Sequence, residues 1–92
     1  MLELRVSLSA EEVLCECRRR GLVVRTERGL AGREGGRHWH LGTPGRPGTL
    51  ELSEWRSDVW LKVHPRRDGG WARTLATELH EIASSPRRAC GS

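Results

Sequence analysis

The chain has 92 residues, a formal net charge of +4 and no apolar run that approaches the length of a membrane span. This length predicts one domain with a modest hydrophobic core. The N-terminus lacks a basic region followed by an apolar stretch, so we expect a cytoplasmic protein without a secretory signal or membrane contact. Arginine supplies nearly all of the positive charge, which suits an anionic partner but also fits the codon usage of a GC-rich genome.

The first two predicted elements are a strand and a helix. Apolar and polar residues alternate over 2–8, which is typical of a half-buried strand. Ser9 and Glu12 have the spacing of a capping box, so a helix is expected over about 10–20. Gly21 is the expected left-handed end of this helix. Its apolar face has the spacing of one helical stripe: Ala10, Val13, Leu14 and Cys17.

Four further strands are expected in the middle of the chain. Residues 22–28 are rich in β-branched side chains and predict the second strand. Residues 29–36 hold four glycines and predict a mobile loop or a wide hairpin connection. A third strand is expected over 37–41, followed by a turn of proline and glycine over 42–48. Alternation over 49–55 and 59–64 predicts two strands that form a hairpin.

The C-terminal part predicts a second helix and a tail. Pro65 ends the last strand, and Asp68 is a plausible cap for a helix over about 70–84. The apolar stripe of this helix is Trp71, Leu75, Leu79 and Ile82. Residues 86–92 are expected to be a flexible basic tail that follows a single domain over 1–85.

These elements follow the order β-α-β-β-β-β-α and predict the α+β class. Two helices with one apolar stripe each need a sheet on which to pack, and alternating strands offer one apolar face. We therefore expect a two-layer sandwich in which a mostly antiparallel sheet of four or five strands carries both helices on one face.

The opposite face of the sheet is the expected partner-binding surface. If the apolar parity of each strand faces the helices, the other parity turns two tryptophans outward together with basic and histidine side chains. Large exposed apolar side chains mark interfaces, although Trp55 and Trp60 can also pack against each other. The first hypothesis is a non-catalytic interaction module that binds another protein or forms a homodimer. The residues of this surface are His38, His40, Trp55, Trp60, Lys62 and His64.

An alternative function is nucleic-acid binding through the phosphate backbone. The candidate anion contacts are Arg46, Arg66, Arg67 and Arg73. Arg66 and Arg67 approach the expected N-terminus of the second helix, where free backbone N–H groups favour a phosphate. Asp68 competes for the same N–H groups, so a capped helix beside a solvated basic turn is the preferred interpretation of this segment.

The third hypothesis is a small metal protein or enzyme that uses His38, His40 and Glu51. His38 and His40 share one strand face, but a third histidine at position 64 would lie two strand spacings away, roughly 10 Å. That separation is long for one ion with bonds of ~2 Å. Glu51, on the strand between them, could come closer. With no complete catalytic or metal motif, we expect no enzyme activity, metal or cofactor.

Overall fold

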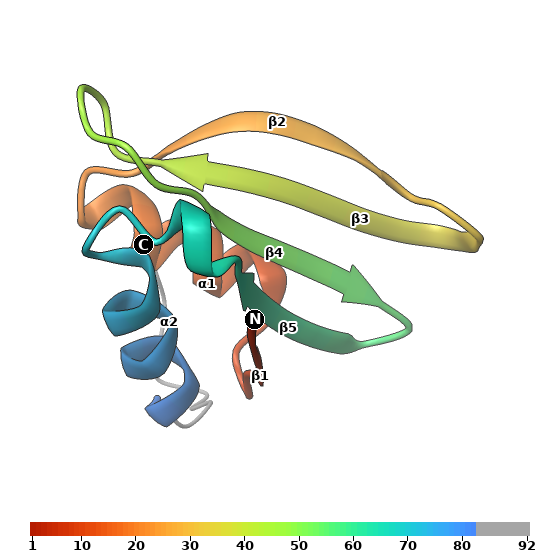
Figure 1. Ribbon diagram of the computed structural model, residues 1–92. Helices are drawn as coiled ribbons and strands as arrows, with labels where there is room; N and C mark the ends of the chain where they lie inside the picture. Colours follow the sequence, from red (N-terminus) through yellow and green to blue (C-terminus); the bar gives the residue numbers. More distant parts are fainter. Residues whose placement is uncertain (83–92) are drawn as a thin grey trace.

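The computed structural model describes residues 1–82, which form a five-stranded sheet and two α-helices in the order β-α-β-β-β-β-α (Figure 1). The elements are β1 (Leu2–Arg5), α1 (Ala10–Arg19), β2 (Val23–Leu30), β3 (Arg33–Gly42), β4 (Leu50–Trp55), β5 (Asp58–Val63), the short 3-10 helix η1 (Pro65–Arg67) and α2 (Ala72–Glu81). The predicted α+β class and element order are confirmed. The predicted tail over 86–92 lies outside the described residues.

All neighbouring strands are antiparallel, and the sheet order is β1-β5-β4-β3-β2. The central strand is therefore β4, with β3 and β5 on either side. Both helices lie against the same face of the sheet (Figure 1). Neither helix in residues 1–82 is long and apolar enough to cross a membrane.

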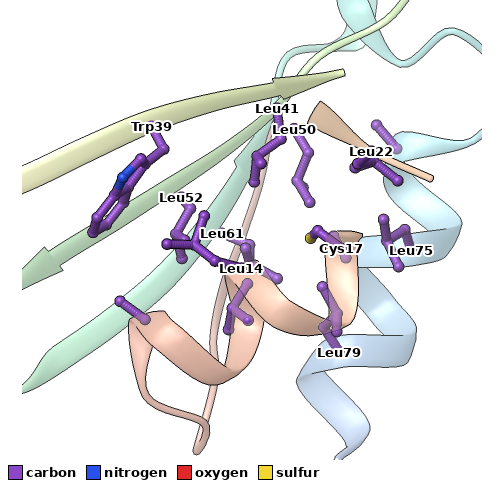
Figure 2. Close-up of a cluster of buried hydrophobic side chains, with 14 of the residues drawn as sticks. Leu14, Cys17, Leu22, Trp39, Leu41, Leu50, Leu52, Leu61, Leu75 and Leu79 are labelled. Atoms are coloured by element: carbon purple, nitrogen blue, oxygen red, sulfur yellow. The ribbon is translucent and has the colours of Figure 1, made fainter. Parts of the chain in front are cut away.

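One apolar layer lies between the helices and the sheet. Trp39, Leu52 and Leu61 come from three adjacent strands and are at most 1% exposed. Figure 2 shows them with Cys17 and Leu79, which come from the two helices. Burial of this layer is the main favourable contribution to folding. It also raises the pKa of the Cys17 thiol to about 12, so this cysteine is an inert core residue.

The start of α1 matches its prediction. The Ser9 hydroxyl accepts a hydrogen bond from the backbone N–H of Glu12 at 3.1 Å, and the Glu12 carboxylate accepts one from the backbone N–H of Ser9 at 3.0 Å. This reciprocal capping box satisfies two N–H groups that the helix leaves unpaired. The preceding strand, β1, ends at Arg5 and is therefore shorter than the strand predicted over 2–8.

The glycine-rich segment 29–36 is the main difference from the sequence prediction. It is neither a mobile loop nor a wide connection, because β2 and β3 continue through it to a tight turn at Ala31 and Gly32. Gly36 makes this close pairing feasible, since a Cβ atom there would lie only 2.8 Å from the Leu30 side chain. Because Gly36 has no side chain, the Leu30 side chain can pack directly against its backbone at the tip of the hairpin.

The second helix begins at Ala72 and ends at Glu81, two residues later and three residues earlier than predicted. Asp68 still satisfies a backbone N–H group at the start of this helix. One oxygen of the Asp68 carboxylate accepts a hydrogen bond from the backbone N–H of Arg73 at 2.7 Å. Residues 83 and 84 of the predicted helix lie outside the described part of the chain.

Candidate metal centre

The face of the sheet that points away from the helices carries ionisable side chains in two cross-strand rows. In the first row His40 of β3 lies opposite Glu51 of β4, which lies opposite Lys62 of β5. In the second row His38 lies opposite Ser53. The predicted strand parity is therefore confirmed for this face. Because β3 and β4 are direct neighbours, only one strand spacing separates the two histidines from the carboxylate.

Three donor atoms from this face converge on one point. His38 Nε2 and His40 Nε2 are 3.0 Å apart. Glu51 Oε1 lies 3.2 Å from His38 Nε2 and 3.6 Å from His40 Nε2. The two imidazoles meet edge to face, with an interplanar angle of 77°, which lets both rings direct a nitrogen at the same place. Among residues 1–82 this is the one group of three such side chains with metal-ligand spacing.

Two further side chains hold members of this trio in position. Ser53 is 3% exposed, and its hydroxyl lies 2.7 Å from His38 Nδ1, so the opposite ring nitrogen of His38 faces the cluster. His64 Nε2 lies 2.9 Å from Glu51 Oε2. Each oxygen of Glu51 therefore has its own neighbour: Oε1 faces His38 and His40, and Oε2 is bound by His64.

Two neutral imidazoles cannot place a proton in every contact of this arrangement. A neutral imidazole carries one proton, so at most two protons are available for the three contacts among His38 Nε2, His40 Nε2 and Glu51 Oε1. If both Nε2 atoms are protonated, their hydrogens face each other; if only one is protonated, it can donate to the other, and the bare nitrogen then has no proton to offer Glu51 Oε1. Burial lowers the pKa of His38, and the neighbouring His40 adds to this effect, which favours the neutral ring. A single cation would satisfy all three lone pairs together.

Glu51 is unusually buried for a carboxylate, with 8% of its surface exposed. A buried charge is costly unless it is paired, hydrogen-bonded or bound to a metal. In the same cross-strand row, on the far side of His40, the Thr26 hydroxyl of β2 is buried and has no hydrogen-bond partner among the described residues. Thr26 lies opposite His40 in the sheet. This part of the outer face therefore combines a buried carboxylate, converging imidazoles and an unsatisfied hydroxyl.

The two outer-face tryptophans are half-buried rather than fully exposed. The guanidinium of Arg33, from the tip of the β2–β3 hairpin, lies 5.0 Å from the ring centre of Trp55 and 5.4 Å from that of Trp60. Trp55 also donates its indole N–H to the backbone carbonyl of Glu34 at 3.3 Å. The hairpin tip thus covers part of the apolar surface on which the interaction hypothesis depends. Binding of a protein partner or a second copy stays a prediction.

The four candidate anion contacts lie on exposed positions of loops and helix ends: Arg46, Arg66, Arg67 and Arg73. None of them forms an ion pair with another residue in 1–82. Two of their loops are tied together, because the backbone N–H of Thr49 donates to the carbonyl of Arg67 at 2.7 Å. The phosphate-binding N–H groups at the start of α2 are partly occupied by Asp68.

A hollow of about 380 Å³ adjoins the trio on the outer face. His38 and Ser53 line it on one side, beside Lys62, and Leu30, Arg33 and Trp60 also line it. The sequence analysis identified His38, Trp60 and Lys62 as residues of this face but missed Leu30, Arg33 and Ser53. Ser53 has the parity of Glu51, which could have identified it, whereas Leu30 and Arg33 were hidden in the segment expected to be a loop.

Three comparisons give no relative from which function can be carried over. No protein-family model, no curated protein and no solved structure matches this chain. Its function therefore has to be inferred from the chemistry of the side chains themselves.

Proposed function

We propose that this protein binds one divalent transition-metal ion through His38 Nε2, His40 Nε2 and Glu51 Oε1. The observation that supports the proposal is the convergence of these three atoms, whose separations are 3.0, 3.2 and 3.6 Å. In a tetrahedral zinc site with bonds of 2.0–2.1 Å, two ligand atoms lie about 3.3 Å apart. An ion at that bond length from all three atoms would sit about 0.8 Å above their plane, close to the position of a tetrahedral centre.

The donor set suits imidazole-binding metals better than hard cations. Two neutral imidazoles and one carboxylate favour zinc, iron, cobalt or nickel, whereas calcium and magnesium prefer oxygen ligands. The same triangle is also one face of an octahedron, the geometry of two-histidine, one-carboxylate iron sites. Both geometries leave at least one coordination position without a protein ligand. Three protein ligands and an open position are typical of metal sites that bind an exchangeable group.

The surroundings of the trio support this assignment. Ser53 contacts the far nitrogen of His38, and His64 contacts the second oxygen of Glu51. Metal-binding histidines and carboxylates commonly have such outer hydrogen bonds, which fix the ring orientation and the direction of the lone pair. His64 therefore acts as a positioning residue for Glu51. In this role His64 does not have to reach across two strands to the ion.

Isothermal titration with Zn²⁺ tests this function, using the full chain without a histidine tag after treatment with a chelator. We expect a stoichiometry of one ion per chain. At a free zinc concentration of 100 times Kd, the melting temperature should rise by about 10–20 °C, because the ion binds only the folded state. Mg²⁺ should produce no such shift.

Two isosteric variants make the test specific. Glu51→Gln should weaken zinc binding by more than about 100-fold, since ligand loss exceeds the 10–100-fold effect of outer-shell changes. Glu3→Gln removes the same charge from the same sheet face, where Glu3 pairs with Lys62 at 3.7 Å, and should bind one ion as the wild type does. Equal binding by wild type and Glu51→Gln would refute the proposed centre.

The unpaired arginines support a second candidate function, nucleic-acid backbone binding. Arg66 and Arg67 are exposed beside the loop of Arg46, to which a backbone hydrogen bond links their segment. Filter binding at two salt concentrations tests it: we expect affinity that falls steeply with salt and that weakens when Arg66 and Arg67 are both changed to Gln. No binding at low salt would exclude it.

A further inference from the structure

Two neighbouring hollows lie on the outer face of the sheet, at the end where the tips of the β2–β3 and β4–β5 hairpins meet (Figure 1). Their volumes are about 380 and 220 Å³, and Glu3, Arg33 and Trp60 line both of them. We infer that these two hollows bind single-stranded nucleic acid, with one phosphodiester on Arg33 and a flanking base in each hollow. This inference rests on the second candidate function, nucleic-acid binding, and does not involve the metal centre.

The Arg33 side chain is held in position while its charge remains available. Its guanidinium lies 5.0 Å from the ring centre of Trp55 and 5.4 Å from that of Trp60. Among residues 1–82 this guanidinium forms no ion pair and donates no hydrogen bond. A guanidinium presents five N–H donors in a planar fork that fits a phosphate group. Because two rings already hold it, Arg33 loses little conformational freedom when it binds an anion.

The charge around the hollows favours a phosphodiester. The other charged side chains that line them form two ion pairs, Arg5 with Asp58 at 3.5 Å and Lys62 with Glu3 at 3.7 Å. Arg33 therefore supplies the one unbalanced charge. Each phosphodiester of a nucleic acid carries one negative charge, which matches it. A phosphate dianion would bring a second charge close to the carboxylates of Glu3 and Asp58.

The walls of the hollows favour bases on either side of this phosphodiester. Trp60 lines both hollows, and Trp55 lines the smaller one. Tryptophan rings and guanidinium planes both stack on bases, and every base has a face to offer. The rest of the lining is largely polar, which suits base edges because they carry hydrogen-bond donors and acceptors.

The same geometry favours a single strand over a duplex. The bases of a duplex are paired and stacked, so each would have to leave the helix before it could enter a hollow. The bases of a single strand can be splayed apart at much lower cost. The shared Arg33 lies between the hollows, as a phosphodiester lies between two successive nucleosides.

Fluorescence anisotropy tests this inference, using a labelled strand of about 15 nucleotides and the full chain in the presence of chelator. We expect a Kd between about 1 and 100 μM at 0.1 M salt. The duplex of this strand with its complement should bind at least about five-fold more weakly. Chelator keeps the proposed metal centre empty, so the result does not depend on it.

Three variants separate the contributions of charge and stacking. Arg33→Gln should weaken binding by about five-fold and reduce the slope of log K against log salt by about 0.7, because one phosphate contact is lost. Trp60→Leu should weaken binding by about ten-fold without changing this slope, since stacking involves no phosphate. Arg56→Gln is the matched control. Its guanidinium also lies over the Trp55 ring, 4.4 Å from the ring centre, but lines neither hollow, so affinity should change by less than about two-fold.

The outcomes distinguish this inference from the second candidate function. Absence of binding by strand and duplex at low salt would overturn both. Equal or tighter binding of the duplex, or unchanged binding by Arg33→Gln, would overturn only the inference. Arg33 is exposed on a hairpin tip, so this variant should fold even if Trp60→Leu does not. A polyglutamate peptide that competes as well as the strand would also overturn the inference, because it offers charge without bases.

Discussion

The two faces of β4 are both buried, but their chemistry is opposite. On the helix side Leu50 and Leu52 are 0% exposed and lie in the apolar core. On the outer side Glu51 and Ser53 are 8% and 3% exposed, and their polar atoms contact His38 of β3 and His64, the residue that follows β5. Alternate residues of one strand thus experience the same loss of solvent in two different environments.

This difference separates what stabilises the fold from what the protein can bind. Burial of a leucine is favourable by itself, about 1.5–3 kcal/mol per side chain. Burial of a carboxylate is unfavourable unless its partners compensate, and an apolar replacement is often neutral or stabilising. We therefore expect the outer side of β4 to contribute little to the stability of the metal-free fold, and the proposed metal ion would give its buried polar groups a role. The following predictions test this contrast.

The largest effect is expected on the helix side. Leu52→Ala should lower the free energy of unfolding by about 3 kcal/mol, because it removes buried methyl groups and leaves a cavity beneath the sheet. Urea denaturation of the metal-free protein measures this change. Zinc binding by the folded variant should remain within a few-fold of the wild type. A loss of less than about 1 kcal/mol would contradict the central role of this layer.

A smaller effect, on affinity rather than stability, is expected for the adjacent residue on the other side. Ser53→Ala should weaken zinc binding by about ten-fold, because His38 loses the hydroxyl that orients its ring. Ser53→Thr keeps the hydroxyl and should retain most of the affinity. Titration calorimetry of both variants gives the comparison. If Ser53→Ala binds zinc as tightly as the wild type, this serine does not position His38.

The pH dependence of the metal-free protein should show the cost of burying His38. Its pKa in the folded state is lowered by burial and by His40, while Glu51 opposes this shift and Lys62 adds to it. Below about pH 6.5 the unfolded state therefore binds more protons at this site, and stability falls as the pH decreases. Denaturation of wild type and His38→Asn between pH 5 and about pH 8 measures the slope. An equal slope in both would contradict the assignment.

The smallest effect on stability is expected for the carboxylate itself. Glu51→Gln should change the free energy of unfolding of the metal-free protein by less than about 1 kcal/mol, because the amide can still hydrogen-bond to His64 and no charge is buried. Thermal denaturation in the presence of chelator provides the measurement. A loss as large as that of Leu52→Ala would show that Glu51 is part of the structural core.

The sequence was sufficient to predict the layers of the fold. Period-two alternation in β4 and β5 identified which side chains face the helices, and the Ser9 and Glu12 spacing located the start of α1. Both signals are local, so they can be recognised without knowledge of the tertiary structure. The same parity correctly placed the histidines and Glu51 on one face.

The geometry of the site was less accessible, because it depends on pairing between distant strands. On the sequence alone, His64 lies too far from His38 and His40 for the three to share one ion. Strand parity does not reveal that Glu51 places Oε1 beside the two histidines of β3 while His64 contacts Oε2. The hairpin tip was also not predicted. Its glycines suggest a flexible loop as long as the close packing of Leu30 against Gly36 is unknown.

X-ray absorption spectroscopy of the zinc-loaded protein tests the central claim most directly, because it reports the atoms around the ion. We predict nitrogen or oxygen neighbours at about 2.0–2.1 Å together with the outer-shell scattering of two imidazole rings. In Glu51→Gln this pattern should be lost at equal zinc concentration. Sulfur neighbours at about 2.3 Å, or a spectrum of hydrated zinc without imidazole, would contradict a centre built from His38, His40 and Glu51.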